Sequence, residues 1–275
     1  PGGRPPSVRA MTTLLVVGGG KMGEALVGGL LAGGFAEAAD VVVAEPYEPR
    51  RAELAERFPG LVLVPAVDHL HDSVPADAVV AVKPQQVAEV CRALGAVGVR
   101  RILSIAAGVR LATMEAEVPE GTAVVRAMPN TPAMVGAGAS AIAGGAAATD
   151  ADLDWAEQVL GAVGTVVRVA ESQIDAVTGL SGSGPAYVFL VAEALIDAGV
   201  LVGLTRPVAT DLAVQTLRGA AELLATGTPA AELRANVTSP GGTTAAGLRA
   251  LEAAGVRAAF TDAVVAATTR SAELG

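Results

Sequence analysis

The chain has little cysteine, few aromatic residues and no run of basic residues, and each shortage excludes a class of protein. Cys91 is the one cysteine among 275 residues, so no intrachain disulfide and no cysteine-cluster metal site is expected. Aromatic residues make up 3%, which argues against a stacking platform for nucleic acid. The net charge is −9, so nucleic acid and anionic membranes are not expected partners.

No membrane-spanning or export segment is predicted, although 52% of the residues are hydrophobic. The longest uncharged run, residues 127–149, is interrupted by prolines and glycines and cannot form a spanning helix. Residues 1–10 are rich in proline and glycine and lack the apolar core of a signal peptide. We therefore expect a disordered extension over residues 1–10 and a cytoplasmic protein.

Short apolar, β-branched runs alternate with helix-length segments over the first part of the chain. Buried parallel strands are predicted at residues 14–17, 41–44, 61–64, 78–82 and 102–105. Intervening helices are predicted around residues 53–57 and 87–94, and later strands at 123–126, 139–143 and 165–169. This alternation is typical of a doubly wound α/β sheet, so residues 11–170 are predicted to form a Rossmann-like dinucleotide-binding domain.

The second part, residues 171–275, is predicted to be all-helical. Apolar-periodic segments cover residues 187–199, 207–226, 243–254 and 258–274. Pro207 suits the first turn of a helix. Alanine and leucine occur on several faces of these helices, which predicts surfaces buried against a second subunit.

A glycine-rich motif, Gly18-x-Gly20-x-x-Gly23, follows a predicted strand and opens a predicted helix. In that context it is a dinucleotide fingerprint, because glycines let backbone amides approach the pyrophosphate at a helix N-terminus. The alternative is an ordinary tight turn with a solvated Lys21. The candidate cofactor-binding residues here are Gly18, Gly20, Lys21, Met22 and Gly23.

The residues at the end of the second predicted strand bear on the choice of cofactor. Glu45 stands where an acid binds the ribose 2′-hydroxyl and repels a 2′-phosphate, which favours NADH. Arg50 and Arg51 follow closely and could reach the 2′-phosphate of NADPH. A charged loop with no cofactor role is the third interpretation. The sequence leaves NADH or NADPH open, with NADH slightly favoured.

Two further loops are expected to border the cofactor, because ligands bind outside the carboxyl ends of the strands in such sheets. Pro84 also suits a helix start, and that is its alternative role. The candidate residues in the two loops are Ala81, Val82, Lys83 and Pro84 after one strand, and Ala106, Ala107 and Gly108 after the next.

The helical half contains no lysine, histidine or cysteine, since the chain's lysines are Lys21 and Lys83 and its histidines are His69 and His71. A hydroxy-acid dehydrogenase needs a strong proton relay, normally histidine or lysine. An imine differs because its nitrogen is basic enough to arrive protonated, so a hydroxyl group and good positioning can suffice. The absence therefore favours an imine as the substrate.

The loop Ser239-Pro-Gly-Gly-Thr-Thr244 precedes a predicted helix. Ser239 is expected to cap that helix, and the amides of Gly241, Gly242 and Thr243 are expected to hold a carboxylate. The alternative is a loop and cap with no ligand. Residues 182–187, Gly-Ser-Gly-Pro-Ala-Tyr, are either an anion-binding nest or a helix kink with close packing, and the second is favoured.

These motifs occur together with Arg126-Ala-Met-Pro-Asn-Thr-Pro132 and the segment 171–187, in an order that resembles pyrroline-5-carboxylate reductases from about Met11 onward. The resemblance implies reduction of 1-pyrroline-5-carboxylate to L-proline with NADPH or NADH, the last step of proline synthesis. It also implies a homodimer interlocked through the helical domain, which members often build into a decamer.

The resemblance also implies roles for individual residues. It places Thr244 near the substrate nitrogen as the catalytic hydroxyl, the loop Ser239–Thr244 and Glu171 at the substrate, and Asn130 and Asn236 at the cofactor. A β-hydroxyacid dehydrogenase-like reductase is the rival enzyme, but it needs a lysine in the helical half. A non-catalytic NAD(P)-binding regulator is the rival from another class, and it would need no anion-binding loop.

Overall fold

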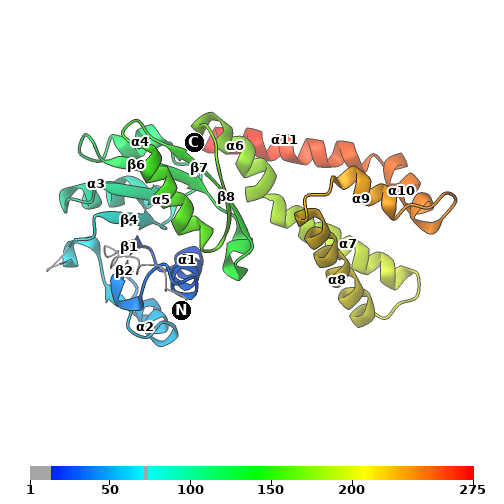
Figure 1. Cartoon of the computed structure of the whole chain (residues 1–275), viewed down its shortest axis with the longest axis horizontal. Coiled ribbons are helices and arrows are strands. Elements are labelled where there is room, and N and C mark those ends of the chain that lie inside the picture. The colour runs from blue at the N-terminus through cyan, green and yellow to red at the C-terminus, as the bar shows by residue number, and fades with distance from the viewer. Residues whose placement is uncertain (1–13, 71–73) are drawn as a thin grey trace, which may run out of the picture. The chain divides into compact units, whose positions relative to one another are not determined.

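In the computed structural model, which describes residues 14–70 and 74–275, the first part of the chain forms one eight-stranded sheet (Figure 1). The strand order is β3-β2-β1-β4-β5-β6-β7-β8, and every neighbouring pair is parallel except β6 with β7. The strands are β1 Leu14–Val17, β2 Val41–Ala44, β3 Val62–Val64, β4 Asp77–Val80, β5 Arg101–Ser104, β6 Ala123–Met128, β7 Gly138–Gly144 and β8 Gly164–Arg168. The predicted doubly wound α/β class is confirmed. The predicted extension at residues 1–10 and the predicted start at Met11 lie outside the described residues, as does His71.

The sheet carries helices on both faces, which explains why its strands are apolar at successive positions. The helices of this part are α1 Lys21–Ala32, α2 Glu48–Arg57, α3 Val87–Ala96, α4 Leu111–Glu115, α5 Asp150–Gly161 and α6 Ile174–Val177. Leu14 and Val16 pack into one core cluster with residues of α1, α2 and α5. Leu15 and Val17 pack into the other, with residues of α3 and α4. Alternate residues of β1 therefore belong to opposite cores.

The prediction that every early strand is buried was wrong for β3. Val62 is 41% exposed, and the other two residues of this strand are only partly buried. The reason is position, because β3 is the outermost strand and pairs only with β2. Its apolar sequence looks like that of a central strand, so composition alone could not identify it as an edge.

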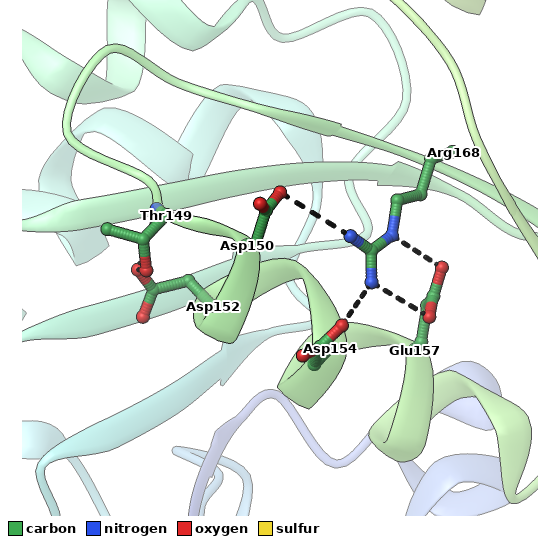
Figure 2. Close-up of polar contacts among 6 residues, drawn as sticks. All are labelled: Thr149, Asp150, Asp152, Asp154, Glu157 and Arg168. Atoms are coloured by element: carbon green, nitrogen blue, oxygen red, sulfur yellow. Dashed lines mark hydrogen bonds and ion pairs between the residues drawn. The ribbon is translucent and has the colours of Figure 1, made fainter.

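The opposite edge strand, β8, is joined to α5 by a charged side chain. Arg168 forms ion pairs with Asp150, Asp154 and Glu157 of α5, as Figure 2 shows. The hydrogen bond from Arg168 lowers the pKa of the Glu157 carboxyl. The main-chain N–H and the hydroxyl of Thr149, the N-cap of the same helix, both donate to Asp152 Oδ2, at 2.8 and 2.6 Å.

The chain divides into two compact units, of which the second is Ser183–Ala266. The first reaches Gly182 and also includes Ala267–Gly275. The remaining helices are α7 Gly184–Leu201, α8 Arg206–Ala225, α9 Ala230–Asn236, α10 Thr243–Ala253 and α11 Val256–Leu274, which begins in the second unit and ends in the first. This division differs from the boundary predicted after residue 170, which stays a prediction about the functional domains.

The helical part follows the sequence pattern closely. Thr205 precedes α8 and Pro207 lies in its first turn, as predicted. The break predicted near residues 182–187 is also present, because a π-helical turn, Thr178–Gly182, comes before the start of α7 at Gly184. Gly182 packs tightly in the first unit, where an added Cβ would lie 2.5 Å from Cε of Met128.

Candidate functional site

The glycine motif lies in the predicted context, between the end of β1 at Val17 and the start of α1 at Lys21. Gly18 has φ +104°, and a Cβ there would lie 2.6 Å from the carbonyl oxygen of Ala81. A Cβ on Gly23 would lie 2.1 Å from the carbonyl oxygen of Gly18, whereas the space around Gly20 is open. Side chains at the first and third glycines would fill the turn, so the motif forms a cradle. The amides of Gly18 and Gly19 donate to Ala44 and Glu45, which leaves the first N–H groups of α1, from Lys21 onward, to face a ligand. This geometry fits a dinucleotide pyrophosphate.

A cleft of about 690 Å³ opens beside this cradle, at the carboxyl ends of β1, β2 and β4. Six of its lining residues are predicted cofactor residues: Gly18, Gly20, Glu45, Ala81, Val82 and Lys83. Another part of the lining was not predicted from the sequence: Pro65, Ala66, Val67 and Asp68 after β3, and Gln86, Glu89 and Val90 near the start of α3. The rule that ligands bind at the carboxyl ends of strands applies to β3 as well, and would have identified the first group.

The Glu45 carboxylate binds the glycine loop directly. Its Oε2 accepts from the Gly19 amide at 2.9 Å, and its Oε1 accepts from the Tyr47 amide at 2.9 Å. A carboxylate that accepts from two backbone amides is fixed in place as well as charged. The structure therefore holds a negative charge beside the glycine cradle.

The two arginines that could reach a 2′-phosphate have other partners. Arg50 donates from Nε to the Gly19 carbonyl at 2.7 Å and pairs with Glu24 and Glu53. Arg51 donates from one nitrogen to the carbonyls of Glu45 and Pro46, each at 2.8 Å. Gly19 is consequently held on both sides, by Glu45 at its N–H and by Arg50 at its carbonyl.

The charge of the cleft follows from these positions. Three carboxylate residues line it, Glu45, Asp68 and Glu89, and the cationic residue in its lining is Lys83. The lining is therefore acidic, which disfavours a dinucleotide that carries a 2′-phosphate relative to one that lacks it.

The other predicted cofactor residues of the sheet have mixed surroundings. Lys21 is exposed at the first position of α1, and Met22 packs partly into the core. Pro84 begins a short 3-10 turn, Pro84–Gln86, which leads into α3, so its alternative role as a helix starter is confirmed. Ala106 is buried and Gly108 has φ +75° in the loop after β5.

Glu171 connects three elements within the first unit. Its Oε1 accepts from the Leu111 amide at 2.7 Å and from Arg126 at 3.0 Å. Arg126, on β6, is 5% exposed, so Glu171 neutralises a buried charge and also binds the first residue of α4. The predicted role of Glu171 in substrate binding stays a prediction.

Asn130 is buried and binds main chain through both ends of its amide. Nδ2 donates to the Ser181 carbonyl at 3.0 Å, and Oδ1 accepts from the Ala139 amide at 2.9 Å. These partners fix the orientation of the amide, since a carbonyl requires a donor and an N–H an acceptor. The predicted contact of Asn130 with the cofactor stays a prediction.

The loop predicted to hold the carboxylate lies in the second unit, between Asn236, the last residue of α9, and α10. The prediction that Ser239 caps α10 was wrong: Gly242 is the N-cap, and the cap has no side-chain hydrogen bond. The cause is an intervening turn, in which the Gly242 amide donates to the Ser239 carbonyl at 3.0 Å and Gly241 has φ +70°. Thr243 and Thr244 are then the first two residues of α10.

Among the described residues, no group of three or more histidine, cysteine, aspartate or glutamate side chains is placed to hold a metal ion. One helical stretch, Glu171–Leu201, is long and apolar enough to span a membrane when judged by length and composition alone. Its apolar window is not buried within the single chain.

The doubly wound sheet, the glycine cradle and the adjoining cleft define a dinucleotide-binding oxidoreductase with a separate helical unit. A family model described as pyrroline-5-carboxylate reductase dimerisation matches residues 171–274, and one described as NADP oxidoreductase, coenzyme F420-dependent, matches residues 13–108. Relatives of 44–45% identity that match nearly the whole chain show that it belongs to the pyrroline-5-carboxylate reductase family.

Similar proteins match the chain over nearly its whole length. It is 44% identical to the pyrroline-5-carboxylate reductase of Mycobacterium leprae, over 96% of this chain and 97% of the relative. It is 45% identical to that of Methanosarcina acetivorans, over 94% and 96%. The pyrroline-5-carboxylate reductase structure from Coxiella burnetii superposes with a TM-score of 0.90 at 35% identity, over 96% and 98%. The Plasmodium falciparum enzyme, solved with NADP bound, gives a TM-score of 0.83 at 29% identity, over 97% and 99%.

Proposed function

We propose that this protein reduces 1-pyrroline-5-carboxylate to L-proline with a reduced nicotinamide dinucleotide, the last step of proline biosynthesis. The observation that carries the proposal is full-length membership of the reductase family in a chain whose glycine cradle and cleft fit a dinucleotide. When bound, the cofactor supplies a hydride. The glycine cradle brings the pyrophosphate of the cofactor to the first amides of α1, which begins at Lys21.

The helical unit supplies the groups for the substrate. The predicted carboxylate site lies at the start of α10, where the helix field and the first N–H groups favour an anion. The Gly242 amide already donates to the Ser239 carbonyl, so the amides of Gly241 and Thr243 are left to hold the carboxylate. The Thr244 hydroxyl oxygen accepts a hydrogen bond from the protonated ring nitrogen and so orients the imine. Residues 171–275 contain no lysine, histidine or cysteine, so the site relies on a substrate that arrives protonated. Glu171 stays a predicted substrate residue, and Asn236 a predicted cofactor residue.

We propose NADH as the preferred cofactor. Glu45 is fixed beside the glycine cradle, where its free lone pairs can accept from ribose hydroxyls and its charge repels a 2′-phosphate. Arg50 and Arg51, the residues that could offset that repulsion, donate to main-chain carbonyls and to the carboxylates of Glu24 and Glu53.

The working form is proposed to be a homodimer formed through the helical unit, which the structure describes completely. Within Ser183–Ala266 only Ala209 and Ala213 are buried hydrophobic residues. Large apolar side chains such as Phe189 and Leu212 are more than half exposed. A helical unit with so small a core needs a second surface to cover it. A second copy fits better than lipid, because the apolar stretch of α7 lies inside the matched dimerisation segment. Assembly into a decamer and a cytoplasmic location stay predictions.

Light scattering after size exclusion tests the dimer. The chain mass is 27.1 kDa, so wild type should elute at twice that mass or at a larger even multiple. Leu212→Glu on α8 should dissociate it. Val135→Glu, at an 81% exposed position in the first unit, is the matched control and should leave the assembly intact. A stable, active monomer of the wild type would refute the proposal.

The activity is tested by following oxidation of NADH and of NADPH separately, with and without 1-pyrroline-5-carboxylate. The product is identified as proline by mass spectrometry. We expect substrate-dependent turnover with both cofactors and a higher kcat/KM for NADH. Cofactor binding without any turnover would instead support a non-catalytic dinucleotide-binding protein.

A further inference from the structure

The carbonyl of Ser181 lies at a point where the helix cannot supply its usual donor. In a continuing α-helix this carbonyl would accept from the N–H of residue 185. Residue 185 is proline, which has no N–H. The sequence therefore leaves this carbonyl, at the end of the π-helical turn Thr178–Gly182, in need of another donor.

Asn130 provides that donor. Its Nδ2 lies 3.0 Å from the Ser181 carbonyl oxygen, and its Oδ1 accepts from the Ala139 amide at the start of β7. The residue is 8% exposed, so water competes little for these bonds. Asn130 thus joins the loop after β6 to the π-helical turn, 51 residues further along the chain.

The position of Asn130 relates this bond to the proposed reaction. The pairs β1–β4, β4–β5 and β5–β6 are all parallel. Their carboxyl ends consequently share one edge of the sheet, the edge of the cofactor cleft. Asn130 follows the carboxyl end of β6, so it fixes the π-helical turn to this edge. π-Helical turns within helices occur frequently at functional sites.

We infer that Asn130 is a positioning residue for the reductase reaction, acting by replacing the main-chain donor that Pro185 lacks. The inference rests on the proposed function, because a positioning role has meaning only for an active enzyme. Asn130 fixes the main chain at Ser181, at the beginning of the Ser181–Pro185 segment, where the chain enters the helical unit. Asn130 itself need not contact the substrate.

The test is a double-mutant cycle between Asn130→Asp and Pro185→Ala, measured by steady-state kinetics. Asn130→Asp keeps the size and the acceptor but loses the donor, and we expect kcat to fall about tenfold or more, the size of effect that slight misplacement produces. The KM for NADH should stay within about twofold, because both ends of the Asn130 amide bind main chain. A rise in this KM with kcat unchanged would instead support the predicted contact of Asn130 with the cofactor and overturn the positioning role. Pro185→Ala restores an N–H at residue 185, so it should recover part of the loss in the Asn130→Asp background while changing wild type little.

Hydrogen exchange provides a readout independent of turnover. The amides of residues 177–190 should exchange faster in Asn130→Asp than in wild type and more slowly again in the double variant. Asn130→Ala, which introduces no charge, replaces Asn130→Asp throughout if the carboxylate prevents folding.

Two results would overturn the inference: an unchanged kcat in the folded Asn130 variant, or effects of the two substitutions that simply add. A wild type without any reductase activity would instead overturn the proposed function. In that case the exchange cycle still shows whether Asn130 acts in place of the missing N–H.

Discussion

Replacing Glu45 tests the basis proposed for cofactor choice. In Glu45→Ser the carboxylate that accepts from the Gly19 and Tyr47 amides is removed. For NADH, loss of a charged hydrogen bond to the ribose costs about 1.5 kcal/mol. For NADPH, removal of a repulsion between charges about 4 Å apart gains about 1 kcal/mol or more, even in high dielectric. Together these terms shift the ratio of kcat/KM for NADH to that for NADPH by about 100-fold, toward NADPH.

The assay is the oxidation of each cofactor at saturating 1-pyrroline-5-carboxylate, with kcat/KM obtained from the initial slopes. Glu89→Gln is the matched control, because it removes another carboxylate of the cleft lining. That control should alter the ratio of kcat/KM much less, since solvent and salt screen the repulsion between the 2′-phosphate and a carboxylate that does not contact it. An unchanged ratio in Glu45→Ser, or an equal shift in Glu89→Gln, would show that Glu45 only shapes the loop and does not select the cofactor.

Three further changes test other parts of the molecule. Thr244→Ala should lower kcat/KM about 10- to 1000-fold while Thr244→Ser keeps much of the activity and cofactor affinity is unaffected; wild-type rates in a folded Thr244→Ala variant would remove the hydroxyl from the mechanism. Glu171→Gln should lower the free energy of unfolding in urea by about 1–2 kcal/mol, because it leaves the buried Arg126 charge unpaired. This cost is smaller than for a fully buried ion pair, since the Glu171 side chain is one-third exposed. Burial raises the pKa of the Cys91 thiol to about 11, so only about one thiol in a thousand is ionised at pH 8. Iodoacetamide should therefore label Cys91 only after unfolding. Fast labelling of the native protein would contradict the buried position.

Local pattern alone located the elements that carry the proposed chemistry. The strand before the glycine motif was predicted at its observed bounds, and the motif opens α1 as expected. The helix after residue 242 was predicted to within one residue of its end. These features depend on short-range rules, namely β-branched runs, glycine geometry and apolar periodicity, and such rules can be read from neighbouring residues.

The tertiary structure decided what those elements do for one another. Sequence showed two arginines near a cofactor site, but only the fold shows that Arg50 and Arg51 already donate to protein carbonyls. The sequence likewise identified β3 as an apolar run, but only the fold shows that this strand lies at the edge of the sheet. The bond from Asn130 to Ser181 joins residues 51 positions apart. Such pairings depend on strand order and on which groups the packed chain leaves without a donor, and both are set by contacts distant in sequence.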